Sequence, residues 1–379
     1  MKKGTNQVPL KILHTADLHL GMTFKNRSYP ETVREQLIEA RFDTLARIVG
    51  LANTEQCALL VIAGDLFHRP NIAATTITRT INILERFQGC TALLPGNHDY
   101  YDHDGPLWRA LRSEAFDELI LLTEEHAYPL QDYGLDAVLY PAPCDKKHSS
   151  TNRLGWIDPP SERPSACHHI GIAHGSVQGI SPDLEDQYFP MTTAELSALK
   201  MQHWCLGHTH VRHPDCNETG QQPFLISGVP EPDGFDCRHS GYVWLTELTD
   251  KKNSSSCAVE TGRLRFREIE KKVYSVADLD SLQQELAPEG ERTLIKLKLC
   301  GALSDTDFRA RGARLNTLRD QLLYLETDDS ELTVEITPEL IAARYPESSF
   351  PHHLLTRLAK RGDPEALHLA YRLADEVKK

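Results

Sequence analysis

The sequence predicts an α/β fold in which a layered β-sandwich core is flanked by helices and followed by a small C-terminal α/β domain. Two observations support this prediction. Short apolar runs typical of buried strands alternate with segments of helical periodicity early in the chain, and later runs are mostly strands. A polar stretch near 247–262 then reads as a surface turn or linker, and a second pattern of strands and helices begins beyond it.

In the first region, apolar runs at 10–14 and 58–63 predict two strands. The segment between them predicts a helix over 31–53, because apolar residues recur at helical spacing at Val33, Leu37, Ile38, Phe42, Leu45, Ile48, Val49 and Ala52. A second helix is predicted over 74–87 and a third strand over 91–94. Further strands are predicted at 118–122, 136–140, 170–173, 203–206, 223–226 and 241–245.

The second region predicts a small α/β domain. Strands are expected at 263–270, 294–299 and 332–336, and a helix is expected at 305–324. From about 338 the chain reads as a helix-loop-helix segment broken at Gly362-Asp363-Pro364. We therefore predict three domains, at 1–250, 263–337 and 338–379.

The composition is typical of a soluble globular protein, with 40% hydrophobic and 25% charged residues among 379. No apolar run approaches the roughly 18 residues that a membrane span needs. Residues 1–9 are polar and have no apolar core behind their lysines, so we expect no secretory signal and a cytoplasmic protein with no membrane partner. The nine cysteines include no Cys-x-x-Cys pair, which argues against a disulfide framework and a zinc–thiolate site.

Five short clusters carry chemistry, and each follows a predicted strand. They are Asp17-Leu18-His19, Gly64-Asp65-Leu66-Phe67-His68, Gly96-Asn97-His98-Asp99, His174-Gly175 and Gly207-His208-Thr209-His210. Open α/β sheets place ligands in the crevice beyond the carboxyl ends of their strands, so distant clusters can converge there. Together they offer enough Asp, His and Asn side chains to hold two divalent metal ions, an arrangement suited to hydrolysis of phosphate esters.

Each residue type suits a particular role in such a centre. Asp65 is the candidate bridge between two ions, because its short side chain holds both oxygens near the backbone. Asp17 and His19 alternate past a strand end, and Asn97 offers a neutral carbonyl oxygen. His208 and His210 are two residues apart, so on an extended segment they point the same way.

Other histidines are expected to act differently. His98 adjoins a ligand and can lie over the substrate phosphate, where it would stabilise charge or protonate the leaving alkoxide. His68 follows the bridge by three residues and could orient the substrate. Asp99 is expected to orient a neighbouring histidine. The remaining histidines in apolar runs are interpreted as satisfied core residues or as supports of the ligands: His14, His168, His169 and His203.

At these residues the chain resembles the calcineurin-like metallophosphoesterases, whose five motif blocks it matches in order. The motifs His14-Thr-Ala-Asp-Leu-His-Leu-Gly21 and Gly64-Asp-Leu-Phe-His-Arg-Pro70 resemble those of the SbcD/YhaO-like DNA double-strand-break repair nucleases. The Gly-Asp-x-x-Asp-Arg-Gly and Gly-Asn-His-Glu motifs of the superfamily's protein phosphatases are not found. The resemblance covers about 10–246 with specific motifs, and 263–379 only in general layout.

The resemblance implies a site, a cofactor and partners. It implies one metal held by Asp17, His19, Asp65 and His210, and another held by Asp65, Asn97, His174 and His208. It assigns His98 and His68 as catalytic residues off the metals, and manganese as the metal. It also implies a homodimer formed by helices behind the second and third motifs, a capping domain, and an SMC-like coiled-coil ATPase partner that binds the C-terminal tail.

Charge is the main departure from the resemblance. The formal net charge is −13, and the stretch after the last motif, 227–236, carries three acids and no base. We therefore expect weak DNA binding by the chain alone, with the partner supplying most phosphate contacts. Lys25, Arg27 and Arg69 follow the first two motifs and are predicted to touch substrate phosphates; solvated loop charges are the alternative.

These observations predict a metal-dependent DNA nuclease (exonuclease or endonuclease) that acts in DNA repair or defence. A phosphodiesterase for nucleotides or other small molecules is the second hypothesis, which the acidic charge favours. A non-catalytic scaffold of the same fold is the third, although a scaffold would be expected to lose ligands and none is missing.

Overall fold

The computed structural model describes residues 9–249 and 253–378, and the N-terminal segment interpreted above as lacking a signal lies almost wholly outside them. The chain divides into two compact units, 1–265 and 266–379. Within the described residues, no helix combines the length and apolarity that spanning a membrane requires.

The first unit contains two mixed sheets packed face to face. Strands of the larger sheet lie in the order β4 (Leu119–Leu121), β3 (Cys90–Leu94), β2 (Leu59–Ala63), β1 (Leu10–Thr15), β11 (Tyr242–Leu248), β12 (Ser254–Glu260) and β9 (Glu218–Thr219). Strands β1 to β4 run parallel, whereas β11, β12 and β9 pair antiparallel. The smaller sheet has the order β10 (Leu225–Ile226), β8 (His203–Gly207), β7 (His168–His174), β6 (Ala137–Ala142) and β5 (Tyr128–Pro129).

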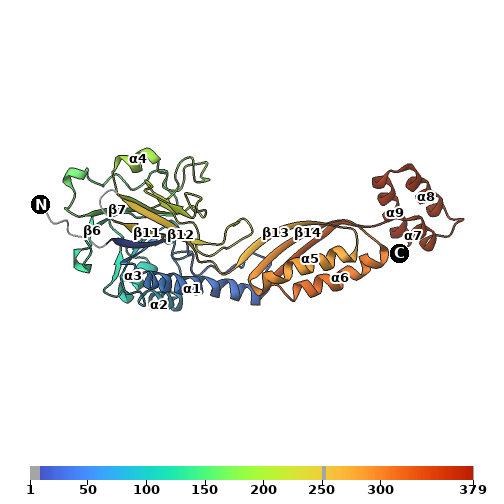
Figure 1. Cartoon of the computed structure of the whole chain (residues 1–379), viewed down its shortest axis with the longest axis horizontal. Coiled ribbons are helices and arrows are strands. Elements are labelled where there is room, and N and C mark those ends of the chain that lie inside the picture. The colour runs from blue at the N-terminus through green and yellow to red at the C-terminus, as the bar shows by residue number, and fades with distance from the viewer. Residues whose placement is uncertain (1–8, 250–252, 379) are drawn as a thin grey trace. The chain divides into compact units, whose positions relative to one another are not determined.

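Helices cover the outer face of the larger sheet, as Figure 1 shows for α1 (Glu31–Thr54), α2 (Ala74–Leu84) and α3 (Pro106–Glu114). Their apolar residues form one core with the outward side chains of β1 to β3, among them Leu13, Leu60 and Leu93. The opposite side chains of the same strands, including Ile12 and Val61, pack against the smaller sheet in a second core. The short helix α4 (Thr193–Ala198) lies on the outer face of the smaller sheet, where its Leu196 is buried beside Trp204. The predicted α/β sandwich flanked by helices is confirmed.

The second unit contains a three-stranded sheet in the order β13 (Arg265–Val273), β14 (Thr293–Leu303) and β15 (Tyr324–Val334). Helices α5 (Val276–Leu286) and α6 (Asp305–Arg319) pack apolar residues such as Leu282 and Leu318 against it. Three further helices, α7 (Pro338–Arg344), α8 (Phe350–Arg361) and α9 (Pro364–Lys378), share a small core around Ile341 and Leu355. The tail thus holds three helices rather than the two expected.

The interpretation of 247–262 as a surface turn or linker is wrong for 254–260, while 250–252 lie outside the described residues. Residues Ser254–Glu260 form β12, which pairs antiparallel with β11 along its whole length and is fully integrated in the larger sheet. The serine-rich sequence is accommodated because its side chains alternate between an interior position at Ser256, bonded to Thr246 (2.9 Å), and exposed ones. Strand pairing here overrides a composition that resembles a turn.

Candidate metal centre

The metal-site residues converge at the carboxyl ends of five parallel strands. Asp17 and His19 follow β1, Asp65 follows β2, and Asn97 follows β3. His174 is the last residue of β7, while His208 and His210 follow β8. Asp17, His19, Asp65, Asn97 and His174 are at most 2% exposed, whereas His210 lies at the exposed rim. The crevice predicted from the motif spacing therefore forms between the two sheets.

The loops that carry these residues adopt unusual backbone conformations. Asp17, His19, Asp65 and His208 all have positive φ, at 56°, 47°, 55° and 95°. Non-glycine residues rarely adopt this region, and it costs about 1–2 kcal/mol per residue. The first two loops hold each other in place, because the Asp17 N–H donates to Gly64 O (3.1 Å) and the His19 N–H donates to Asp65 O (2.9 Å).

Two glycines let the loops approach closely enough for candidate ligands from different loops to lie together. Gly64 has φ of 92°, and a Cβ there would lie 2.2 Å from His174 Nδ1. A Cβ at Gly96 would lie 2.1 Å from Asp65 Oδ1. Both glycines of the motifs are therefore needed sterically, because any side chain would push a candidate ligand out of place.

One group of ligand atoms surrounds Asn97. His174 Nε2 lies 3.0 Å and His208 Nδ1 lies 3.2 Å from Asn97 Oδ1. His174 Nε2 is also 3.5 Å from Asp65 Oδ2, and its Nδ1 donates to Ala63 O (2.8 Å). That last bond leaves Nε2 as the atom free to ligate a cation.

A second group of ligand atoms surrounds His19. Its Nε2 lies 3.3 Å from His210 Nε2 and 3.7 Å from Asp65 Oδ2. Asp17 belongs here too, because one of its carboxylate oxygens lies within 4.8 Å of ligand atoms of His19 and His210. Its Oδ1 is a buried oxygen with no hydrogen-bond partner among the described residues, while its Oδ2 accepts the His208 N–H (3.0 Å). Asp65 Oδ2 lies within 3.7 Å of a histidine from each group, and its role as a bridge between two ions stays a prediction.

This donor set fits divalent metal ions. Three overlapping groups of side chains bring ligand atoms within 4.8 Å of one another: Asp17, His19 and His210; Asp17, Asp65 and His174; and His19, His68 and His98. Carboxylate oxygen and imidazole nitrogen suit manganese, iron or zinc, and no cysteine of the described part of the chain joins these groups. Buried polar atoms normally have a partner, so the unpartnered Asp17 Oδ1 is consistent with a role as a cation ligand.

Burial and mutual charge shift the pKa values in the centre. Burial raises the pKa of Asp17 to about 6, although His174 and His210 oppose it. Burial also acts to raise the pKa of Asp65, but the adjacent His174 outweighs it and holds that pKa well below its usual range. The reciprocal effect, against the opposing influence of burial, raises the pKa of His174 to about 9. Asp65 is therefore the firmly ionised carboxylate of the centre.

His98 and His68 lie side by side over His19. The His98 ring is 4.8 Å from the His19 ring and 5.3 Å from the His68 ring. His98 Nδ1 donates to His68 O (3.0 Å), and the His98 N–H donates to Asp65 Oδ1 (2.8 Å). Burial, followed by the charges of His98 and Arg41, lowers the pKa of His68 to about 4. The role of both histidines off the metals stays a prediction, and their closeness to His19 makes it testable.

The expected role of Asp99 needs correction. Its carboxylate accepts backbone N–H groups from Gly96 (2.7 Å), Phe67 (2.9 Å) and Asp65 (3.2 Å), and none of its described bonds reaches a histidine. Asp99 therefore fixes the backbone of the bridging loop rather than the orientation of an imidazole. Burial, together with the charge of Asp65, raises its pKa to about 7.

The other predicted residues have mixed outcomes. Lys25, Arg27 and Arg69 are exposed on the loops that follow the first two motifs, and their contact with substrate stays a prediction. His168 bonds Gln202 (2.8 Å) and His169 bonds Tyr140 (2.9 Å), as satisfied residues should. His14 and His203 are different, because neither ring nitrogen of either residue has a hydrogen-bond partner among the described residues.

An aromatic pair beside the centre has no counterpart among the sequence predictions. The Tyr188 ring lies 4.8 Å from the His208 ring, and the His148 ring lies 5.1 Å from Tyr188. The Tyr188 N–H donates to Asp183 (3.0 Å), and Tyr188 O accepts the Ser176 N–H (2.8 Å). The two aromatics adjoin because 149 pairs with 188 across a non-local bridge that no local motif encodes.

The fold and this centre define a phosphoesterase of the metal-dependent class. Residues 10–212 match the calcineurin-like phosphoesterase family, and the chain belongs to that family. The resemblance found in its five motifs is thereby confirmed.

Individual relatives support the resemblance to the SbcD/YhaO-like branch of this family. The uncharacterized metallophosphoesterase YhaO of Bacillus subtilis is 27% identical over 282 residues, 65% of each chain. The DNA double-strand break repair protein Mre11 of Methanosarcina acetivorans is 28% identical over 45% of this chain and 26% of its own length. One of the subunits of the nuclease SbcCD of Escherichia coli is 36% identical over 24% of this chain and 21% of its own length. The matched regions thus span less than two thirds of each relative.

Solved structures also resemble the chain, with low scores. A dimetal phosphatase from Danio rerio has a TM-score of 0.35 at 10% identity, covering 67% of this chain and 100% of its own. The Pseudomonas putida nuclease MPE has a TM-score of 0.23 at 20% identity, covering 48% and 73%.

Proposed function

We propose that this chain is a dinuclear metal-dependent nuclease that hydrolyses DNA phosphodiester bonds, in repair or defence, together with an SMC-like ATPase. The observation that carries the proposal is the position of Asp65 Oδ2, within 3.7 Å of His19 and 3.5 Å of His174 at the meeting point of two ligand groups. The names of two relatives, a DNA double-strand break repair protein and a component of a nuclease, support DNA as the substrate.

Seven side chains would hold the ions, for which we propose Mn²⁺. One ion would take Asp17, His19, Asp65 and His210, and the other Asp65, Asn97, His174 and His208. Two such ions, when bound, supply Lewis-acid stabilisation of phosphate oxygens and lower the pKa of water.

The chain's own catalytic group in this proposal is His98. Its Nδ1–H is held by His68 O (3.0 Å), which fixes the ring and leaves Nε2 for the substrate. A protonated Nε2 can donate to a phosphate oxygen or to the departing alkoxide, which is general-acid work suited to an imidazole. His68, whose low pKa keeps its ring neutral, would then orient the substrate rather than supply the proton.

A nucleic-acid substrate also suits the rim of the centre. Tyr188 presents an aromatic ring beside His208, the His148 ring lies beside that of Tyr188, and unpaired bases stack on such rings. Lys25, Arg27 and Arg69 are exposed on the neighbouring loops and are proposed phosphate contacts. The net charge of −13 is the observation that favours the second candidate, a phosphodiesterase for small substrates.

The proposal includes two protein interfaces in a cytoplasmic protein. Helix α9 and its neighbour α8 expose large apolar side chains, with Leu369 at 51%, Leu373 at 52% and Phe350 at 76% exposure, and we propose that this tail (338–379) docks the ATPase coiled coil. Residues 263–337 would form the capping domain.

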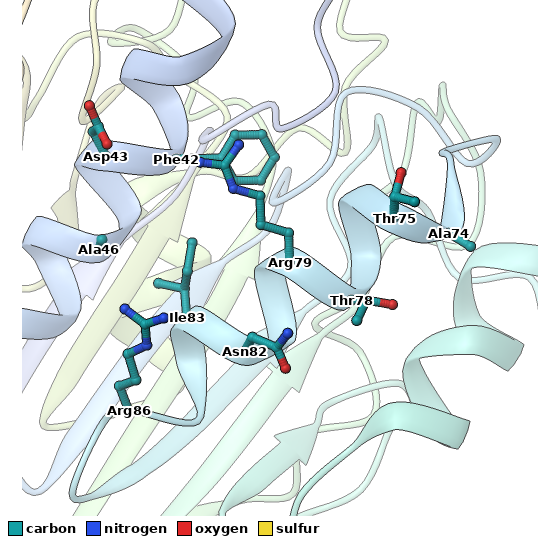
Figure 2. Close-up of a pocket in the computed structure, with 10 residues that line it drawn as sticks. All are labelled: Phe42, Asp43, Ala46, Ala74, Thr75, Thr78, Arg79, Asn82, Ile83 and Arg86. Atoms are coloured by element: carbon teal, nitrogen blue, oxygen red, sulfur yellow. The ribbon is translucent and has the colours of Figure 1, made fainter.

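Helices α2 and α3 are the proposed homodimer helices. A groove of about 630 Å³ lies beside α2. Figure 2 shows Arg79, one of the residues that line it, over the Phe42 ring, 3.9 Å from the ring centroid.

One assay separates the candidates. Purified protein with Mn²⁺ is expected to cut labelled single- or double-stranded DNA, to do so faster with its ATPase, and to stop with EDTA. An Asp65→Asn variant supplies the background control. Cleavage of bis(p-nitrophenyl) phosphate without any cleavage of DNA, with or without the ATPase, would favour the small-substrate phosphodiesterase and refute the nuclease.

Docking of the ATPase has its own test. Leu369→Glu with Leu373→Glu should abolish co-purification with the ATPase while leaving cleavage of short DNA by the isolated chain unchanged. Tyr274→Glu, which places the same charge at an exposed apolar side chain outside the tail, is a matched surface control. Retained co-purification in the double variant would contradict the docking site.

A further inference from the structure

The acidic stretch after the last motif faces the interior rather than the substrate. Of its three acids, Glu231 is 1% exposed, the Asp233 side chain is 13% exposed, and only Asp236 is an exposed residue. Buried carboxylates require partners. What these two acids bind inside the first unit therefore determines what the stretch does.

Asp233 pairs with a buried arginine. Arg41 of α1 is 2% exposed, and its Nη2 lies 3.2 Å from Asp233 Oδ2. The other arm of the same guanidinium, Nη1, donates to Leu18 O (2.5 Å). Arg41 also lies over the Phe24 ring, 5.5 Å from its centroid. One side chain thus joins the loop after the last motif to the loop of the first motif.

Glu231 fastens the same loop one helical turn further along α1. It accepts the Thr44 hydroxyl and the N–H groups of Arg263 (2.8 Å) and Leu264 (2.9 Å). Arg41 and Thr44 are three residues apart and so project from the same face of α1. The stretch is therefore held along its length by α1, and Arg41 is held in turn.

Leu18 is the residue between two candidate ligands. Asp17 and His19 on either side both have positive φ, and their N–H groups bond the second loop. That pairing leaves the Leu18 carbonyl to be fixed by Arg41. The loop after the last motif reaches the other side of the same ligand group, since the Val229 N–H (3.1 Å) and His239 Nε2 (2.9 Å) both donate to His210 O.

We propose that Arg41 is a positioning residue, and that the Arg41–Asp233 pair is a buried clamp that holds Asp17 and His19 for the first metal ion. The proposal rests on the proposed metal centre. An isolated buried ion pair contributes little net stability, so its expected effect is on geometry. The acids of 231–233 are then internal counter-charges to Arg41, rather than a surface that repels DNA.

The test measures metal binding without DNA. In the full-length protein, Arg41→Lys keeps the charge but loses the fork that reaches both partners. We expect calorimetric titration to show Mn²⁺ binding at one of two sites weakened roughly 10- to 100-fold, the usual effect of losing a residue that supports a ligand. Asp233→Asn should weaken the same site, and the double variant should be no weaker than Arg41→Lys alone, because the pair acts as a unit. Deuterium uptake by the peptide 16–22 should rise in both single variants.

Controls make each outcome decisive. Arg47→Lys changes an exposed arginine of the same helix whose described hydrogen bond is to Thr261 O (3.4 Å), and should bind Mn²⁺ as the wild type does. Equal weakening in this control, or wild-type Mn²⁺ affinity in both Asp233→Asn and a folded Arg41→Lys, would overturn the clamp. If Arg41→Lys does not fold, Asp233→Asn, at the more accessible end, decides alone. A protein that binds Mn²⁺ with these differences but never cuts DNA would refute the nuclease and leave the clamp standing.

Discussion

Replacing Asp65 by asparagine should separate the two roles of this carboxylate. Asp65 Oδ1 accepts the His98 N–H (2.8 Å), while Oδ2 lies within 3.7 Å of His19 and 3.5 Å of His174. Asparagine keeps the shape but has only one oxygen. If that oxygen stays on the His98 N–H, an NH₂ group faces both ligand groups; if the amide flips, the His98 N–H loses its acceptor.

The expected loss follows from burial. Asp65 is 1% exposed, and removing one partner of a buried charged interaction costs about 3–5 kcal/mol. Since about 1.4 kcal/mol corresponds to tenfold in Kd, Mn²⁺ affinity should fall by roughly 100- to 1,000-fold or more. The pKa of His174 should also fall, because Asp65 contributes most among the groups that raise it against burial.

Calorimetric Mn²⁺ titration measures the first effect, and NMR titration of the His174 ring in metal-free protein measures the second. Asp43→Asn, on the helical layer, is a matched carboxylate-to-amide control that should retain wild-type Mn²⁺ affinity. If Asp65→Asn bound two Mn²⁺ ions with wild-type affinity, Asp65 would not be the shared ligand. The assignment of ligands to both metal ions would then be wrong.

Three further predictions address the other residues. His98→Ala should keep both ions while cleavage falls roughly 10²- to 10⁴-fold, the usual contribution of a general acid; loss of an ion in metal analysis would make His98 a ligand instead. Replacing Lys25, Arg27 and Arg69 by Gln should weaken DNA binding and flatten its salt dependence, and an unchanged salt slope would identify them as solvated charges. Burial lowers the pKa of His203 to about 4 and, with the charge of His203, that of His14 to about 3. The unfolded chain, with histidine pKa near 6.5, then binds these protons more readily, so the contribution of these two histidines to metal-free stability should be fully present above pH 6.5 and decline as pH falls toward 4. Urea unfolding of His203→Leu should show a shallower decline, and a slope equal to that of the wild type would contradict this.

The convergence of the candidate ligands could be predicted from the sequence because its signals are local. Each ligand adjoins an apolar run, and β1, β2 and β3 occur within a few residues of the runs at 10–14, 58–63 and 91–94. Parallel strands then place their carboxyl ends together, so convergence of Asp17, Asp65 and Asn97 follows from topology.

The features that could not be predicted depend on long-range pairing. β12 was hidden because a serine-rich segment becomes a strand only beside Tyr242–Leu248. Helix α5 was also missed, although Ser275 and Asp278 form a capping box at its start. Arg41 carried no signal, since a charged residue within a helical segment normally faces water, and its burial requires Asp233, far along the chain. The contrast between Glu231, which faces inward, and Asp236, which is exposed, likewise depends on tertiary contacts.

The left-handed backbone at Asp17, His19, Asp65 and His208 has an evolutionary consequence. Strain at these four residues lowers the stability of the fold at all times. It is useful only while the residues hold cations for catalysis. Glycine tolerates this conformation better than aspartate or histidine does. Descendants released from selection for hydrolysis should therefore drift toward Gly at 17, 19, 65 and 208 and become more heat-resistant. A raised melting temperature combined with such substitutions would identify family members that have lost hydrolytic activity.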